Sequence, residues 1–139
     1  MLYSIRVPRS SISARGATPR SDAALAAMGR IDVLVNNAGL ERITPLGGPD
    51  EVEDTFRRIT DINTNGTFYV TRHAVPKMGP GGRIIVTASI WSRVAVPEFA
   101  AYVTSKHANL GFMRVMAKEL GPRGIRVNAV CPGWVRTEA

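Results

Sequence analysis

The sequence predicts an α/β domain with a doubly wound parallel sheet, of which it supplies three central strands and two long helices. Short, wholly apolar runs recur along the chain and have the composition of strands buried on both faces of a sheet. Long segments with the helical spacing of apolar residues separate these runs. Strands that alternate with long helices form right-handed βαβ units, and such units build a parallel sheet.

The regular pattern begins with an Ala-rich stretch, residues 21–28, which is predicted as the last turns of a helix ending near Gly29. Residues 32–36, DVLVN, are the first expected strand. Residues 49–78 are expected to be mostly helix, because four acidic residues stand in its first turn, where the helix dipole favours negative charge. Pro80 makes continuation of this helix unfavourable.

The second part of the chain repeats the order strand, helix, strand. Residues 83–88, RIIVTA, are the second strand, and residues 99–120 are the second long helix. Gly121 is expected to cap this helix, and residues 124–130, GIRVNAV, are the third strand. A complete Rossmann-like sheet of about six or seven strands needs roughly 200 residues, because each βαβ unit takes ~30. The 139 residues therefore predict a partial Rossmann-like sheet.

The first twenty residues differ in composition from the rest. They are rich in Arg and Ser, contain no acidic residue and show no periodicity. This profile fits an organelle transit peptide or a disordered, mis-started leader, and we favour the second. We therefore expect residues 1–20 to be a disordered or irregular leader and residues 21–139 to be one domain.

Composition argues against several classes of partner. The net charge of +7 falls to +3 beyond residue 20, where 14 basic residues face 11 acidic ones, and no basic stripe appears. Nucleic-acid binding is therefore not expected. No apolar run approaches the ~20 residues that cross a bilayer, so no membrane contact is expected either. Cys131 is the single cysteine, which makes a reducing cytoplasm the default location. No residues have metal-ligand spacing.

Tyr102 and Lys106 lie four residues apart in the second long helix, so their side chains share one face. A free phenol has a pKa near 10, and an adjacent ammonium is expected to lower the pKa of Tyr102. On its own this pair is weak support for a function, because a Tyr and a Lys at this spacing are usually only neighbours.

Polar or glycine-rich residues follow each of the three expected strands, at the carboxyl edge where α/β sheets bind ligands. Asn63 lies within the first long helix, near Gly66, which permits close approach or a local bend. Trp91 and Trp134 follow residues of this edge and either line a pocket or simply pack. The edge residues are Asn37, Ala38 and Gly39 after the first strand, Ser89 after the second, and Pro132 and Gly133 after the third.

In order and spacing these residues resemble the short-chain dehydrogenase/reductase family over roughly residues 28–139. The resemblance implies an oxidoreductase that moves a hydride between a nicotinamide cofactor and an alcohol or ketone. It makes Tyr102 the general acid/base and Lys106 the group that lowers its pKa and binds the ribose. It gives Ser89 the task of orienting and polarising the substrate oxygen, and Asn63 that of holding a water.

The resemblance also implies that NAD or NADP binds at the carboxyl edge, beside a small-molecule alcohol or ketone substrate. In the family the two long helices pack against a partner subunit, so a homo-oligomer is expected. The implied cofactor-binding residues are Asn37, Ala38, Gly39, Tyr102, Lys106, Pro132, Gly133, Val135 and Thr137.

The family's glycine-rich turn, which seats the cofactor pyrophosphate on a helix N-terminus, has no match in the sequence. Residues 21–139 are therefore expected to be the catalytic half of the domain, with residues 32–36 as an open sheet edge. Two hypotheses stay open. The chain is either part of an oxidoreductase with a Tyr-Lys-Ser-Asn site or an inactive fragment, at most an oligomerisation module.

Overall fold

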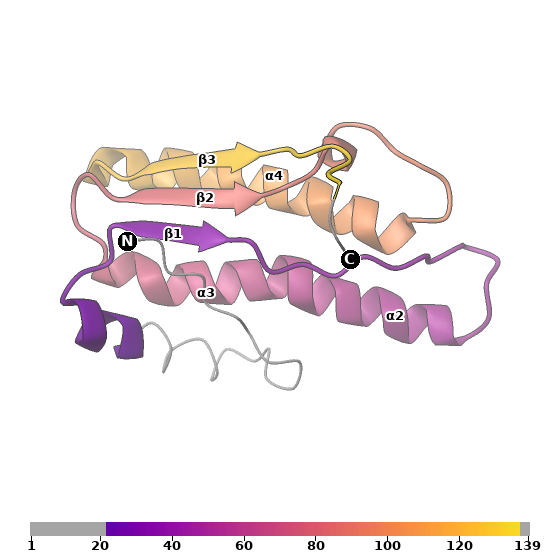
Figure 1. Ribbon diagram of the computed structural model, residues 1–139. Coiled ribbons are helices and arrows are strands. Elements are labelled where there is room, and N and C mark those ends of the chain that lie inside the picture. The colour runs from indigo at the N-terminus through magenta and orange to yellow at the C-terminus, as the bar shows by residue number, and fades with distance from the viewer. Residues whose placement is uncertain (1–21, 137–139) are drawn as a thin grey trace.

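The computed structural model describes residues 22–136, and a three-stranded parallel sheet lies at its centre (Figure 1). The strands are β1 (Val33–Asn36), β2 (Arg83–Thr87) and β3 (Arg126–Val130), in the order β1-β2-β3. The expected leader at residues 1–20, like Thr137, lies outside the described residues. The predicted strands and their parallel arrangement are confirmed, although β3 begins two residues later than the apolar run does.

The first long helical segment joins four consecutive elements: α2 (Glu51–Thr60), a π-helix η1 (Asp61–Asn65), α3 (Gly66–Ala74) and a 3₁₀ turn η2 (Val75–Lys77). The prediction of a mostly helical segment here is confirmed. The π-helix, which adds a residue to the turn, was not predicted.

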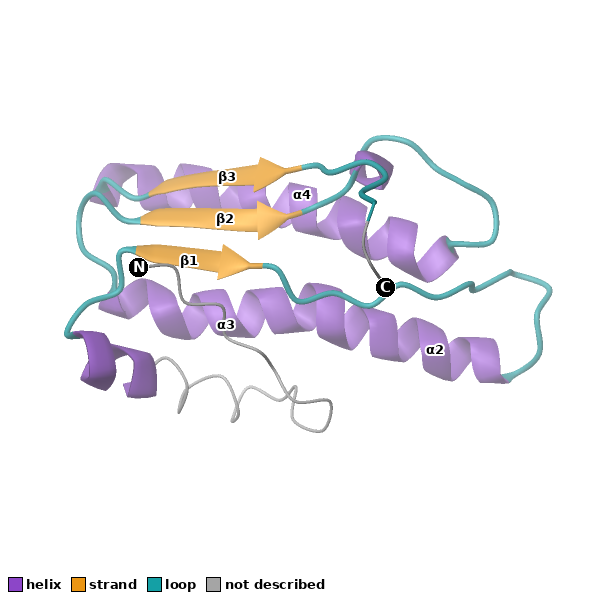
Figure 2. Cartoon of the chain, in the orientation of Figure 1, coloured by secondary structure: helices purple, strands orange, loops and turns teal. Residues whose placement is uncertain are grey.

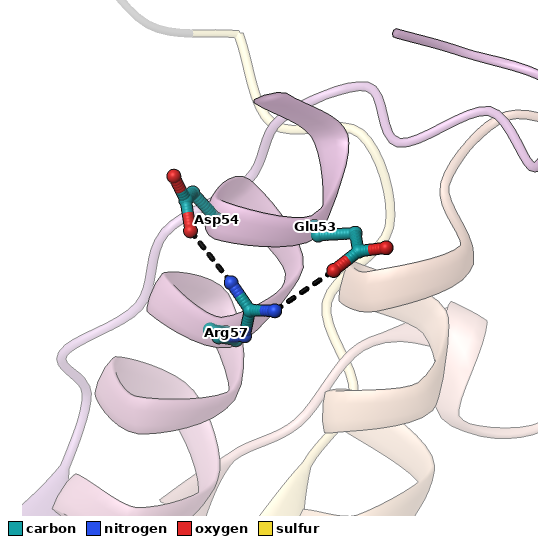
Figure 3. A network of polar contacts seen from close by, with 3 residues as sticks. All are labelled: Glu53, Asp54 and Arg57. Carbon is teal, nitrogen blue, oxygen red and sulfur yellow. Dashed lines mark hydrogen bonds and ion pairs between the residues drawn. The ribbon is translucent and has the colours of Figure 1, made fainter. Parts of the chain in front are cut away.

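The first turn of α2 carries Glu51, Glu53 and Asp54, as the dipole argument predicted. Arg57 bridges two of these carboxylates, at 2.8 Å from Glu53 and 2.7 Å from Asp54 (Figure 3). All three side chains of this network are largely exposed to solvent. Exposed pairs of this kind add little to stability. The network therefore orders side chains within α2 and contributes little to the stability of the fold.

The second long helix is α4 (Ala100–Leu120), which runs beside the sheet in Figure 2. Gly121 is the C-cap of α4, as predicted, although its backbone is not left-handed. Gly121 has φ −52° and opens a 3₁₀ turn, η4 (Gly121–Arg123), in which Pro122 supplies the fixed φ that suits the start of a turn. The left-handed residue is Gly124, with φ 72°, and the chain turns into β3 there.

The core lies between the sheet and the helices α3 and α4. It is formed by alternate strand residues, because successive side chains of a strand point to opposite faces. The opposite face is more open, with Val33 36% and Val130 48% exposed. Within residues 22–136, β1 pairs only with β2. The buried core residues include Leu34, Ile84, Val86 and Val127 from the strands and Ala74, Met116 and Leu120 from the helices.

In the described part of the chain, no helix combines the length and the apolar composition needed to cross a membrane.

Candidate active site

A cavity of about 320 Å³ lies at the carboxyl edge of the sheet, where all three parallel strands end. Seven of the predicted site residues line it, and they come from the ends of the strands and the first turns of α4. Ala38, Asn63 and Val135 do not line it, and Thr137 lies outside the described residues. The seven residues are Asn37, Gly39, Ser89, Tyr102, Lys106, Pro132 and Gly133.

Further residues line the cavity that sequence reasoning did not assign to the site. Trp91 and Trp134 were placed either in a pocket or in plain packing, and the structure places both in the cavity wall. The remaining lining residues are Glu41, Thr87, Ala88 and Ile90.

Lys106 is 4% exposed, and its Nζ lies over the Tyr102 ring, 5.4 Å from the ring centroid. The ammonium donates a hydrogen bond of 2.8 Å to the carbonyl oxygen of Thr87, at the end of β2. Burial lowers the pKa of Lys106, and the negative charge of Glu41 opposes this shift. The spacing prediction that Tyr102 and Lys106 share a helix face is therefore confirmed.

The predicted lowering of the Tyr102 pKa is wrong for this structure. Burial raises the pKa of Tyr102 above its usual 10.0, and the charge of Glu41 raises it further, while a hydrogen bond with the Ser89 side chain opposes both. Burial disfavours the phenolate because the anion loses hydration. Lys106 lies over the ring and donates to Thr87, and burial together with the charge of Glu41 outweighs the hydrogen bond with Ser89.

Ser89 links the end of β2 to the cavity and to a short helical turn, η3 (Ile90–Ser92). Its Oγ accepts a hydrogen bond of 3.2 Å from the amide of Trp91, and the Oγ of Ser92 accepts one of 3.1 Å from the amide of Ser89. Ser89 is therefore a helix cap as well as a neighbour of Tyr102. The capping bonds fix its hydroxyl within the site, 7% exposed.

Asn63 is completely buried in the π-helix and holds the segment that follows β1. Its Oδ1 accepts from the Leu40 amide at 2.7 Å, and its Nδ2 donates to the Leu40 carbonyl and the Ser105 hydroxyl, both at 2.9 Å. One amide thus connects the β1 edge, the π-helix and α4. Its predicted role of holding a water stays a prediction.

An aromatic cluster forms one wall of the cavity. The ring of Trp91 lies 5.0 Å from that of Phe99 and 5.7 Å from those of Tyr102 and Trp134, centroid to centroid. Edge-to-face contacts at these distances are favourable for aromatic pairs. Trp91 therefore braces the Tyr102 ring from the side of the cavity, while Trp134 is 86% exposed at its mouth.

Among residues 22–136, no three His, Cys, Asp or Glu side chains are placed together as a metal site would need.

A family model described as enoyl-(acyl carrier protein) reductase matches residues 18–139. The chain belongs to the short-chain dehydrogenase/reductase family. An uncharacterized oxidoreductase of Methylorubrum extorquens is 40% identical, and the match covers 92% of this chain and 50% of that protein. D-beta-hydroxybutyrate dehydrogenase of Cupriavidus necator is also 40% identical, over 78% of this chain and 42% of that protein. The chain thus spans about half the length of the curated relatives it matches.

Solved structures of this family have the same fold. Carveol dehydrogenase from Mycobacterium avium, in complex with NAD, is 35% identical with a TM-score of 0.80, over 87% of this chain and 44% of that one. A short-chain dehydrogenase from Burkholderia cenocepacia, in complex with NADP, is 33% identical with a TM-score of 0.84, over 91% and 51%. The predicted α/β class and the partial Rossmann-like sheet are confirmed.

The residues at the cavity suit the nicotinamide half of such a cofactor. Lys106 has three N–H donors and uses one on Thr87, which leaves two for the hydroxyl groups of a ribose. Gly39 lies against Lys106, since a Cβ atom there would be 3.6 Å from its Nζ. Asn37, whose Oδ1 accepts from the Thr87 hydroxyl at 2.8 Å, is fixed at the same edge.

Proposed function

We propose that the chain belongs to an NAD(P)-dependent short-chain dehydrogenase/reductase that interconverts an alcohol and a ketone at the cavity of Ser89, Tyr102 and Lys106. The observation that carries the proposal is the convergence of these three residues at one cavity, from β2 and α4. The match to the family supports the reaction class.

In the proposed reaction Tyr102 is the general acid in the direction of reduction. Its raised pKa keeps the phenol protonated at neutral pH, so it can donate its proton to the carbonyl oxygen and take it back in the reverse direction. Ser89 donates a hydrogen bond to the same oxygen and polarises the carbonyl. The nicotinamide supplies or accepts the hydride when it is bound.

We further propose that Asn37, Ala38, Gly39, Lys106, Pro132, Gly133, Val135 and Thr137 hold the cofactor. NAD is bound in the carveol dehydrogenase structure and NADP in the Burkholderia structure, so both are candidates. The proposed substrate is a small-molecule alcohol or ketone, and a cytoplasmic location stays a prediction from the single cysteine.

The second candidate is that these 139 residues do not turn over a substrate. The described residues 22–136 contain no glycine-rich turn between a strand and a helix that could seat the pyrophosphate. An open strand edge and an exposed aromatic surface then favour an oligomerisation module. We propose that this module contacts a second copy through α3 and α4. The contact would include Phe68 and Val115, which are 40% and 50% exposed, and Phe112, whose ring centroid lies 5.8 Å from that of Phe68.

Cofactor turnover separates the two candidates. The full chain is mixed with NADH or NADPH and a panel of neutral ketones, and absorbance of the reduced nicotinamide is followed. Tyr102→Phe is expected to lower turnover by about 100-fold or more, because it removes the acid. Tyr69→Phe, the same substitution on α3 outside the cavity, is the control and is expected to leave the rate unchanged.

Equal rates in Tyr102→Phe and the native chain would contradict the proposed acid. If neither nicotinamide is oxidised by the native chain, the inactive candidate holds for these 139 residues. Size-exclusion chromatography of Phe68→Glu then tests the proposed helix contact, and an unchanged elution volume would contradict it.

A further inference from the structure

One acidic residue, Glu41, lines the cavity and has no part in the proposed reaction. Glu41 lines it together with the reacting groups, and its side chain is exposed to solvent. Within residues 22–136 no cation forms an ion pair with the Glu41 carboxylate: the nearby Arg42 side chain donates to the Glu41 backbone carbonyl at 2.7 Å instead. The Glu41 carboxylate can therefore act on a ligand that enters the cavity.

The backbone that carries Glu41 is held at both ends. On one side, both hydrogen-bonding groups of the Leu40 peptide are taken by the buried amide of Asn63. On the other side, the Thr44 amide donates to the Glu98 carbonyl at 2.6 Å, and the Thr44 hydroxyl accepts from the Ala101 amide at 3.0 Å. Few residues separate these anchors, so Glu41 cannot drift away from the cavity.

The charge of Glu41 reaches the reacting groups. It raises the pKa of Tyr102 and opposes the lowering of the Lys106 pKa, two residues that lie in the same cavity. A ligand bound between them experiences the same field. Two indoles, Trp91 and Trp134, line the same cavity, and indole rings attract other rings and cations. Lys106 is the cation that lines the cavity, but it is 4% exposed, it uses one N–H donor on Thr87, and the charge of Glu41 acts against any anion that approaches it.

We infer that Glu41 is a specificity-determining residue, which makes the cavity prefer ring-bearing alcohols and ketones that are neutral or cationic over those that carry a carboxylate. The inference rests on the proposed function, because it assigns the substrate class of that same site. Glu41 and the two indoles all attract a cationic group on the ligand. A carboxylate on the ligand is repelled by Glu41 and is not attracted by the indoles.

The test measures binding and needs no cofactor. Trp91 and Trp134 are the only tryptophans of the chain and both line the cavity, so intrinsic fluorescence reports directly on its occupancy. Three alcohols with one ring skeleton serve as probes: trans-4-aminocyclohexanol as the cation, trans-4-methylcyclohexanol as the neutral form and trans-4-hydroxycyclohexanecarboxylate as the anion. The measured quantity is the ratio of the Kd of the anion to the Kd of the cation.

Glu41→Gln is expected to change each charged ligand's Kd by about three- to fivefold in opposite directions, as exposed charge pairs do. The ratio then falls by about 9- to 25-fold, the product of the two changes. Glu41→Lys is expected to lower it further. Glu119→Gln is the control, because it makes the same change of charge on α4 about 25 Å from Tyr102 along the helix axis. This substitution is expected to leave the ratio unchanged.

A ratio that changes less than twofold in Glu41→Gln, or that changes equally in Glu119→Gln, overturns the inference. Emission that none of the three alcohols alters overturns it as well. These outcomes are independent of the turnover assay, because the titration contains no nicotinamide. A chain that binds the cation with the expected ratio and yet oxidises no NADH or NADPH would contradict the proposed function and support the inference.

Discussion

Replacing Asn63 by Ala is expected to be among the most destabilising changes in the site. The substitution removes three hydrogen bonds of a completely buried side chain, to both groups of the Leu40 peptide and to the Ser105 hydroxyl. Each such bond contributes about 1 kcal/mol net, and partners left without water cost more. The expected loss is therefore about 2–4 kcal/mol in the free energy of unfolding, a large part of the ~5–15 kcal/mol typical of a domain.

Asn65→Ala is the matched control, because it makes the same substitution in the same π-helix. Asn65 makes one hydrogen bond, of 2.8 Å to Asp61, at the exposed side of the helix, so a loss below about 0.5 kcal/mol is expected. Urea and thermal unfolding followed by far-ultraviolet circular dichroism measure both. For a domain of this size, 1 kcal/mol corresponds to about 4 °C in Tm. A loss below about 1 kcal/mol for Asn63→Ala, or no greater than that of Asn65→Ala, would refute the reasoning.

Four further outcomes are expected. Because the Ser89 side chain lowers the pKa of Tyr102, Ser89→Ala should move it further above 10.0, measured from the tyrosinate band; no shift would disprove the contact. Because the pKa of Tyr102 is raised in the folded state, its contribution to the free energy of unfolding is present below about pH 10. That contribution is lost as the pH rises from about 10 through the folded-state pKa of Tyr102. Gly124→Ala should lower the free energy of unfolding by about 1–2 kcal/mol, because φ at Gly124 is 72°. Gly121→Ala should leave it unchanged, because φ is −52° and a Cβ atom there would have no neighbour within 4 Å. Equal losses would contradict this reasoning. Arg57→Ala should cost less than about 1 kcal/mol in urea unfolding, and a greater loss would show that the exposed network is more than surface.

Seven of the predicted residues line one cavity because the parallel topology of the sheet brings the strand ends together. Residues that follow the strands of a parallel sheet meet at one edge, so Asn37, Ser89 and Gly133 could be placed together from the strand ends alone. Tyr102 and Lys106 could be added from helical spacing. The confirmed three-strand sheet is thus the reason why the cavity residues were foreseeable.

The details that the sequence did not predict depend on backbone geometry and burial. A π-helix differs from an α-helix by one residue per turn, and residues 61–65, DINTN, contain no Gly or Pro that would mark it. The sequence placed the cap of α4 at Gly121, but it did not show that the left-handed residue before β3 is Gly124. The pKa of Tyr102 rises because of burial, which spacing along a helix does not reveal.

Of the four lining residues that the sequence did not assign, Glu41 and Thr87 act on the proposed reacting groups, and they were missed for different reasons. Glu41 follows the edge residue Gly39 by only two positions, so the argument from strand ends could have included it. Thr87 contributes its backbone carbonyl to Lys106, and a backbone contact leaves no signal in the residue type.

The hydrogen bonds of Asn63 have a consequence for the order in which the protein folds. They join partners 23 and 42 residues apart, and each contact closes a long loop before it gains any energy. Such contacts form after the helices, whose hydrogen bonds join residues only about four apart. The amide of Leu40, which donates to Asn63, is therefore expected to acquire protection from hydrogen exchange during refolding later than the amides in the middle of α4.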